Sequence, residues 1–172
     1  MADVLFGDYN PQGKLPVTFY KSTDQLPDYE DYSMKGRTYR YFTDALFPFG
    51  YGLSYTRFEV GEATLKRGKG ATCRLSVPVT NKGARDGTEV VQLYIRNLND
   101  PDGPLKSLRS FQHVSVKAGQ TATAELQLDE KSFEFFDEKT NTMCVRPGQY
   151  ELLYGTSSLD KDLKKLIYTL NE

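Results

Sequence analysis

The stretch LPDYEDY carries three carboxylates that could take part in acid–base chemistry. Asp28 and Glu30 would lie on one side of an extended chain, with Asp31 next to them. Two carboxyl groups about 5 Å apart, or further apart when a water molecule must fit between them, can hydrolyse a glycosidic bond. The neighbouring residues are those of a polar loop and predict no cleft. A solvated acidic linker is therefore the favoured interpretation.

The remaining reactive side chains predict no catalytic residue, no cofactor and no metal site. His113 is the only histidine, and strand alternation places it on the outer face. Aligning NDPDGP with a calcium-binding loop would put Leu98 at the first ligand position, so a turn is predicted there. Cys73 and Cys144 have no zinc or redox spacing and are interpreted as a buried pair of free thiols, although sequence alone does not exclude a disulfide.

Two aromatic-rich stretches, KGRTYRYF and FPFGYGLSY, have the residue types of a binding site. Guanidinium and phenol groups could line the rim of an active site, and the rings could stack on a ligand. Aromatic and arginine side chains are also enriched at ordinary interfaces, which favours packing between domains. The candidate residues for either role are Arg37, Tyr39, Arg40, Tyr41, Phe47, Phe49, Tyr51 and Tyr55.

Composition excludes several classes of partner. The 172 residues are 38% hydrophobic and 26% charged, which is typical of a globular protein. A net charge of -1, from 22 basic and 23 acidic residues, gives no basic surface for nucleic acid. No apolar run approaches the roughly 18 residues that a membrane span needs, and the N-terminus does not read as a signal peptide.

From residue 57 onward the sequence predicts an all-β fold. In TCRLSVPVT, Cys73, Leu75, Val77 and Val79 alternate with outward-facing residues. Pro78 cannot donate to a ladder, so this strand is expected at a sheet edge or next to a bulge. Several further short strands are separated by turns. This pattern predicts an antiparallel immunoglobulin- or fibronectin III-like β-sandwich of about seven strands.

The first 56 residues are organised differently. A helix end near Gly7, a turn at YNPQGK and a short apolar strand at residues 15–20 make half of an α/β unit, which cannot bury its own faces. We therefore expect this segment to have been cut out of a longer chain.

The order of five motifs supports a family resemblance. These are ADVLFGDYNPQGKLPVTF, YRYF, FPFGYGLSYT, NKGARDGTEVVQLYI and PGQYELLYGTSS. The chain resembles the C-terminal end of glycoside hydrolase family 3 enzymes of the β-glucosidase or β-xylosidase kind. The resemblance implies that residues 1–22 are the terminal piece of an α/β sandwich domain. It implies that residues 23–56 are an aromatic-rich inter-domain linker and that residues 57–172 are a fibronectin type III-like domain. The family's catalytic Asp and Glu lie in upstream domains, so it implies no catalytic residue here.

Three roles follow as hypotheses. The resemblance favours a non-catalytic module that is inactive alone and braces the missing catalytic domains of a parent enzyme. That parent would hydrolyse β-glucosides or β-xylosides. It would be a periplasmic or secreted protein of a bacterium. Exposed rings would instead suit a carbohydrate-binding module. A protein-docking or oligomerisation module is the third hypothesis, because the strand at residues 15–20 would expose an unpaired edge for self-association.

Overall fold

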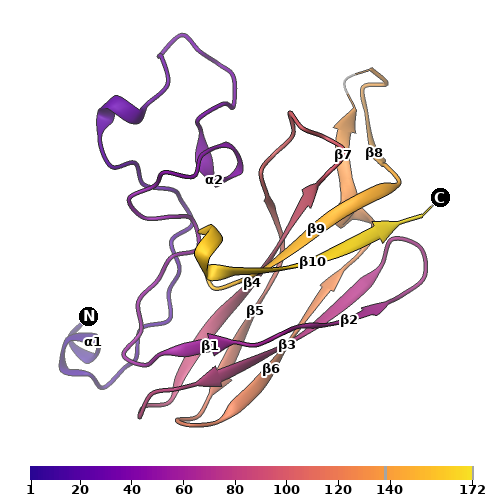
Figure 1. The fold of residues 1–172 in the computed structure, drawn as a ribbon. Helices are drawn as coiled ribbons and strands as arrows, with labels where there is room; N and C mark the ends of the chain where they lie inside the picture. The colour runs from indigo at the N-terminus through magenta and orange to yellow at the C-terminus, as the bar shows by residue number, and fades with distance from the viewer. Residues whose placement is uncertain (138, 172) are drawn as a thin grey trace.

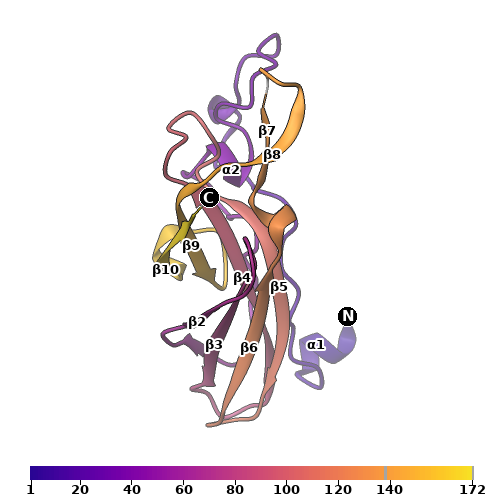
Figure 2. The same cartoon turned by 90° about the vertical axis from the view of Figure 1, so that its right-hand side faces the viewer.

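Two antiparallel sheets pack face to face in the computed structural model, which describes residues 1–137 and 139–171 (Figures 1 and 2). The first sheet consists of β1 (Phe58–Val60), β2 (Thr64–Arg67), β3 (Cys73–Asn81) and β6 (Thr121–Leu128). The second has the order β10 (Leu163–Leu170), β9 (Gly148–Gly155), β4 (Gly87–Asn97) and β5 (Ser107–Val116). A separate hairpin pairs β7 (Glu134–Asp137) with β8 (Thr142–Val145). The predicted all-β sandwich is confirmed.

The core lies between the inner faces of the two sheets. Leu75, Val77 and Val79 of β3 are fully buried, as the alternation in the sequence predicts. They belong to one cluster with Val91 and Leu93 of β4 and with apolar side chains of β6 and β9. The histidine prediction is also confirmed, since His113 is exposed on β5. Both cysteines are free thiols, but only Cys73 is buried in the core, and Cys144 on β8 is half-buried, which corrects the expectation of a buried pair.

Pro78 marks a break in the hydrogen-bond ladder and not an edge strand. β3 pairs with β6 along one side and with β1 and β2 along the other. Between β1 and β2 the partner strand is interrupted at residues 61–63, opposite Pro78. The carbonyl of Pro78 accepts a hydrogen bond from Gly61 there at 2.8 Å. The missing N–H therefore falls where β3 has no regular partner, so the edge alternative is wrong. The irregularity lies in the partner strand, since β3 itself keeps an unbroken register with β6 through Pro78.

Residues 1–56, called the strap below, lie along the outer face of the second sheet (Figure 1). The strap contains α1 (Ala2–Phe6), a 3-10 turn η1 (Thr23–Gln25) and α2 (Thr38–Tyr41). Two further 3-10 turns, η2 (Glu130–Phe133) and η3 (Asp160–Asp162), connect strands of the sandwich. In the described part of the chain, no helix has the length and apolar character to cross a membrane.

The predicted strand at residues 15–20 is paired within the strap. Leu15 exchanges backbone hydrogen bonds with residues 50 and 51, and Phe19 with residues 46 and 47. Pro16, which faces the opposite edge, has no N–H to donate. The predicted strand is wrong as a regular element, because residues 15–20 bend at Pro16 and contain only an isolated bridge between Phe19 and Phe47. The linker stretch FPFGY pairs with one edge, and among the described residues the edge that contains Pro16 is the unpaired one.

Candidate functional site

The strap contacts the sandwich at β4, and the surface between the strap and the outward-facing residues of β4 is called the seam below. Val91 and Leu93 face the core, yet Val90, Gln92 and Tyr94 on the opposite face are buried as well. A strand in an antiparallel sandwich normally exposes its second face to water. In this molecule the strap covers that face, so β4 is the element that positions the predicted aromatic residues.

Tyr39 and Phe49 are seated in the seam. Their rings stack with centroids 4.3 Å apart, and the Tyr39 ring meets the edge of Tyr94 at 5.7 Å. The Tyr39 hydroxyl accepts a hydrogen bond from the backbone N–H of Leu108 at 3.0 Å. The Phe49 carbonyl accepts another from Ser158 at 2.9 Å. Burial raises the pKa of Tyr94 far above its ordinary value, followed by a smaller effect from Tyr39.

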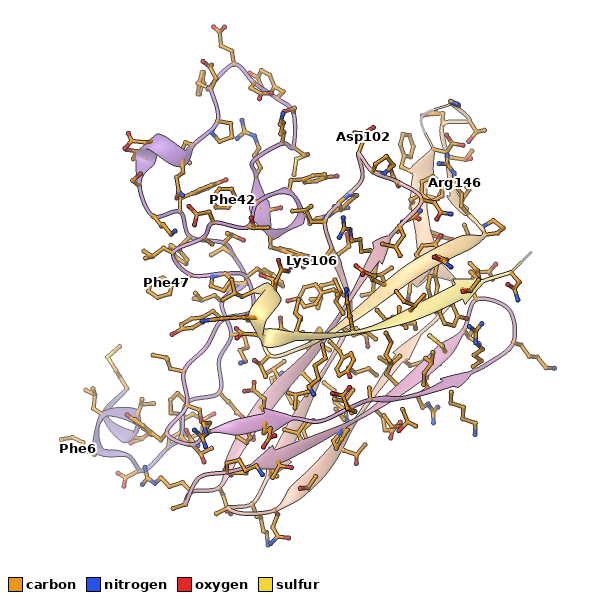
Figure 3. All side chains as sticks on the ribbon, viewed as in Figure 1. Phe6, Phe42, Phe47, Asp102, Lys106 and Arg146 are labelled. Carbon is orange, nitrogen blue, oxygen red and sulfur yellow. The ribbon has the colours of Figure 1, made fainter. Side chains whose placement is uncertain are left out.

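Phe47, Tyr51 and Tyr55 lie on the outer side of the strap. Phe47 is 40% exposed and contacts Phe19 edge-on, with 6.3 Å between centroids, and Tyr51 at 5.4 Å. In Figure 3 Phe47 and Phe6 point away from the sandwich. The Tyr55 hydroxyl donates to the carbonyl of Val4 at 2.7 Å, which ties α1 to the end of the strap. The aromatic stretch thus has seated rings and half-exposed rings.

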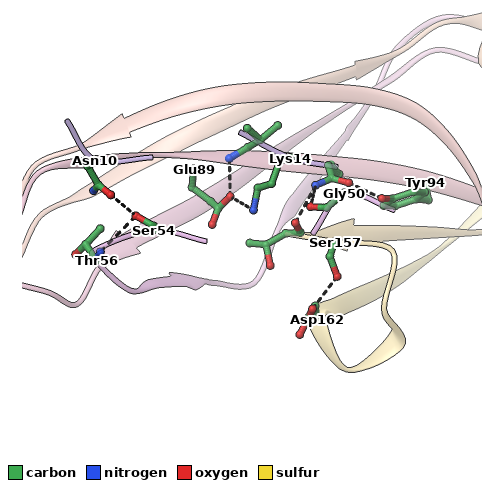
Figure 4. A network of polar contacts seen from close by, with 12 residues as sticks. Asn10, Lys14, Gly50, Ser54, Thr56, Glu89, Tyr94, Ser157 and Asp162 are labelled. Carbon is green, nitrogen blue, oxygen red and sulfur yellow. Dashed lines mark hydrogen bonds and ion pairs between the residues drawn. The ribbon is translucent and has the colours of Figure 1, made fainter. Parts of the chain in front are cut away.

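A buried amide fastens the turn of the aromatic stretch to β4 (Figure 4). The turn closes through the Tyr51 N–H, which donates to the Pro48 carbonyl, and it has Gly50 at φ 78°. Gln92 donates from Nε2 to the Gly50 carbonyl at 3.1 Å and to Thr156 at 2.8 Å. Its Oε1 accepts a hydrogen bond from Tyr94. Gln92 was not among the predicted site residues, and the only hint in the sequence is its polar side chain within an otherwise apolar strand.

A second polar contact fastens the first part of the strap. Lys14 forms an ion pair of 2.6 Å with Glu89 of β4, and the two side chains are only 16% and 11% exposed. Asn10 donates to the Asp86 carbonyl at 3.0 Å and accepts from the Tyr55 N–H and the Ser54 hydroxyl. These polar side chains were also missed, because each finds its partner more than 40 residues away.

Arg37 donates its side-chain hydrogen bonds to carbonyl groups of its own loop. Its Nε donates to the Ser33 carbonyl at 3.0 Å, and its Nη2 donates to the carbonyl of Asp31. The loop is also held by side chains that accept from backbone N–H groups, Asp28 from Glu30 and Asp31 from Ser33. These hydrogen bonds from Ser33 lower the pKa of Asp31. The carboxylates of Asp28 and Asp31 therefore form loop turns, and Glu30 takes part through its backbone N–H, which agrees with the solvated-linker interpretation.

Arg40 and Tyr41 lie apart from the seam, at a groove between α2, the loop at residues 98–106 and the β7–β8 hairpin. The Arg40 side chain lies over the Tyr41 ring, 5.9 Å from its centroid. Behind this region the buried Lys106 donates to the Ser158 carbonyl at 2.9 Å and pairs with Asp160. In residues 1–137 and 139–171, no three His, Cys, Asp or Glu side chains are grouped to hold a metal ion.

Two family models match the chain. Residues 1–55 match the glycosyl hydrolase family 3 C-terminal domain, and residues 89–158 match a fibronectin type III-like domain. A xylan 1,4-beta-xylosidase of Xylanibacter ruminicola is 70% identical over 171 residues, which are 99% of this chain and 20% of that protein. A periplasmic beta-glucosidase of Salmonella typhimurium is 37% identical over 92% of this chain and 23% of that protein.

Solved structures of β-glucosidases superpose on nearly the whole of this chain. DesR, a beta-glucosidase from Streptomyces venezuelae solved with D-glucose, superposes with a TM-score of 0.88 at 30% identity, over 99% of this chain and 24% of that one. A beta-glucosidase from Listeria innocua superposes with a TM-score of 0.82 at 28% identity, over 99% and 26%. The chain therefore spans about a fifth to a quarter of the length of these relatives.

Proposed function

The chain belongs to glycoside hydrolase family 3 as the C-terminal region of such an enzyme, with its fibronectin type III-like domain, and on this premise we propose that it braces the catalytic domains of a parent protein. In this role the chain performs no chemistry itself. The parent hydrolyses O-glycosidic bonds of β-glucosides or β-xylosides, the activities by which the relatives are named. The strap is the docking element, and the sandwich holds it in shape.

The uneven distribution of exposed apolar side chains carries the proposal. Helix α1 buries none of its five residues, and Leu5 and Phe6 are 75% and 83% exposed. Large exposed apolar patches mark interaction sites, whereas scattered single residues do not. Most of the large apolar side chains exposed in the described residues lie in the strap. They are Met1, Leu5, Phe6, Tyr9, Val17, Phe19, Leu26, Tyr29, Tyr32, Met34, Leu46, Phe47, Leu53 and Tyr55.

A paired substitution tests the bracing role. We expect Leu5→Ser with Phe6→Ser to leave the melting temperature of the 172-residue chain almost unchanged, because both side chains are already in water. In the parent enzyme the same change should destabilise the fold, by about 2 kcal/mol for each side chain that is buried at the docking surface. Phe136→Ser, on the exposed β7–β8 hairpin, is the control. Equal melting temperatures of wild-type and substituted parent would refute the proposal.

The absence of catalysis in this segment needs its own assay. The purified 172-residue chain should not hydrolyse nitrophenyl β-glucosides or β-xylosides, since the carboxylates of Asp28 and Asp31 are engaged in loop turns and leave Glu30 without a second free carboxylate in the acidic loop. Turnover that co-purifies with the chain and disappears in a Glu30→Gln variant would contradict this part of the proposal.

Carbohydrate binding is a second candidate function, favoured by two tyrosines at the tip of the acidic loop. Tyr29 and Tyr32 are 92% and 90% exposed, and the hydrogen bonds of Arg37 hold the loop that carries them. Such rings offer flat amphipathic faces to a sugar. Titration with xylo-oligosaccharides or cello-oligosaccharides should then shift amide signals of residues 26–36 in NMR spectra. Unchanged spectra at millimolar sugar would eliminate this function.

Self-association through residues 15–20 is the remaining possibility for a partner. One edge of this segment is already paired inside the strap, so a second copy would have to use the edge that contains Pro16. A proline there weakens strand addition. Sedimentation velocity at increasing protein concentration tests this contact. A dimer that forms in the wild-type chain and is lost in the Thr18→Pro variant would support it.

A further inference from the structure

We propose that the groove between α2, the loop at residues 98–106 and the β7–β8 hairpin binds a carboxylate-bearing sugar, with Arg40 and Arg109 holding the carboxylate. The proposal rests on residues of this chain and is independent of the bracing role. The groove has a volume of about 890 Å³, within the range of ligand pockets. In Figure 3 the labelled Asp102 and Arg146 mark two of its sides.

Two guanidinium groups in this groove lack a charged partner. Nε of Arg40 is buried and has no hydrogen-bond partner. Arg109 uses Nη2 to donate to the Glu134 carbonyl at 3.1 Å, and the residue as a whole is exposed. In the described part of the chain, neither arginine forms an ion pair. Arginines crowded together in this way are stabilised when an anion binds between them.

The electrostatics of Arg109 agree with this geometry. Partial desolvation, followed by the positive charge of Arg40, lowers the pKa of Arg109 from its ordinary value. The negative charge of Glu134 acts in the opposite direction as a smaller effect, but it forms no ion pair with Arg109. A bound carboxylate would remove the repulsion between the two guanidinium groups. It would also accept two parallel hydrogen bonds from a guanidinium, the geometry that arginine provides best.

Among the described residues, the carboxylates that line the groove form no ion pair with Arg40 or Arg109. Asp137 pairs with Arg146 at 3.4 Å on the hairpin side. Asp100 and Asp102 belong to the loop on the opposite side, where Asp100 packs against Gly103 in a tight turn. The groove therefore has balanced formal charge along its walls and an unpaired positive centre at Arg40 and Arg109, which favours one small anionic group over an extended acidic chain.

Aromatic rings next to the guanidinium groups favour a sugar as the carrier of that carboxylate. Tyr41 lies directly beside Arg40, and Phe135 and Phe136 line the opposite wall. Phe136 is 55% exposed although it is a large apolar side chain. A pyranose ring has an apolar face that can lie on such a ring and a polar edge that can reach side chains such as Asn97 and Ser132. A uronic acid combines that ring with the carboxylate.

NMR titration of the 172-residue chain tests the ligand. We expect D-glucuronate at millimolar concentration to shift the amide signals of Tyr41, Arg109 and Phe136. D-glucose, which has the same ring without the carboxylate, should not shift them, and acetate should act at least about tenfold more weakly than D-glucuronate. Equal shifts from D-glucose would overturn the role of the carboxylate. Equal affinity for acetate would overturn the sugar, and tighter binding of a tetraglutamate peptide would assign the groove to a protein partner instead.

Substitutions test the two arginines. Arg109→Gln should weaken D-glucuronate binding about tenfold or more, and Arg109→Lys should weaken it less, because lysine keeps the charge and loses the paired hydrogen bonds. Arg40→Lys, which preserves the charge at the half-buried position, provides a second variant if Arg40→Gln disturbs folding. Arg74→Gln, on the other sheet, is the matched control and should bind normally. Unchanged affinity in both Arg109 variants would refute the assignment.

Discussion

At the scale of single residues, Gly50 controls the seam through its conformation and its lack of a side chain. Its φ of 78° is in the region that favours glycine, and a Cβ atom would lie 2.0 Å from Oε1 of Gln92. We expect Gly50→Ala to destabilise the chain by about 2 kcal/mol or more, because strain adds to the displacement of a buried amide. The shift in the urea midpoint measures this loss.

Gly70→Ala separates the two effects. Gly70 also has a positive φ, 59°, but nothing lies within 4 Å of its Cβ position. This variant should lose only the conformational part, about 1 kcal/mol. If both variants lost the same stability, the close approach of Gln92 to the turn would have no energetic consequence.

The buried ion pair of Lys14 and Glu89 should be costly to break from one side. Lys14→Met leaves the carboxylate of Glu89 in a mostly buried position, where it retains only the hydrogen bond from the Val90 N–H at 2.7 Å. We expect a loss of about 3 kcal/mol. The double variant Lys14→Met with Glu89→Leu should recover most of it, and urea unfolding of all four proteins gives the coupling.

An exposed ion pair supplies the comparison. Lys21 and Asp44 pair within the strap, but their side chains are 50% and 65% exposed. Lys21→Met should therefore change stability by less than about 1 kcal/mol. A loss as large as that of Lys14→Met would show that burial does not decide the strength of these pairs.

At the scale of elements, β4 connects the strap with the sandwich. The alternation of Val91, Leu93 and Ile95 predicts the inner face of β4, and the structure agrees. The burial of Gln92 and Tyr94 was not predictable, because it depends on a segment that lies about 40 residues earlier in the chain. The alternation of apolar residues shows which face of a strand packs on the core. It does not show whether another segment of the chain covers the opposite face.

Tyr39 tests whether the strap and β4 act as one unit. Tyr39→Ala removes the stack on Phe49 and the contact with Tyr94, so we expect a loss of about 2–3 kcal/mol. Protease cleavage within residues 21–46 should become faster, since the strap loses its anchor on the sheet. Limited proteolysis followed by mass spectrometry measures this.

Tyr29→Ala is the control for this element, because its ring is 92% exposed. It should alter neither the stability nor the cleavage pattern. Cleavage of Tyr39→Ala at the wild-type rate would mean that the strap is held by its polar contacts alone.

At the scale of the whole molecule, buried thiol and phenol groups limit the stability of the fold at alkaline pH. Burial raises the pKa of the Cys73 thiol from 9.0 to about 11 and raises that of Tyr94. Above the ordinary pKa of each group, the unfolded chain releases a proton that the folded chain retains. Stability should therefore be complete below about pH 9 and fall above it, by up to about 1.4 kcal/mol per pH unit for each group.

Urea unfolding at about pH 7 and about pH 10.5 checks this limit. Cys73→Ala should lower stability at both pH values by a constant amount and reduce the fall between them. The measurement at neutral pH is the internal control, because the thiol is protonated in both states there. A wild-type stability that does not change over this range would contradict the prediction.

Alternation and ordered motifs are local properties of the chain, so the sandwich, the inward residues of β3 and β4, and the family were predictable from the sequence. The solvated-loop interpretation of Asp28, Glu30 and Asp31 was predictable as well. The positions of the rings of the aromatic stretch follow from the fold. Phe49 stacks on Tyr39 over β4, whereas Phe47 is on the outer side. Both have the same local pattern, so their difference depends on which surface the folded strap covers.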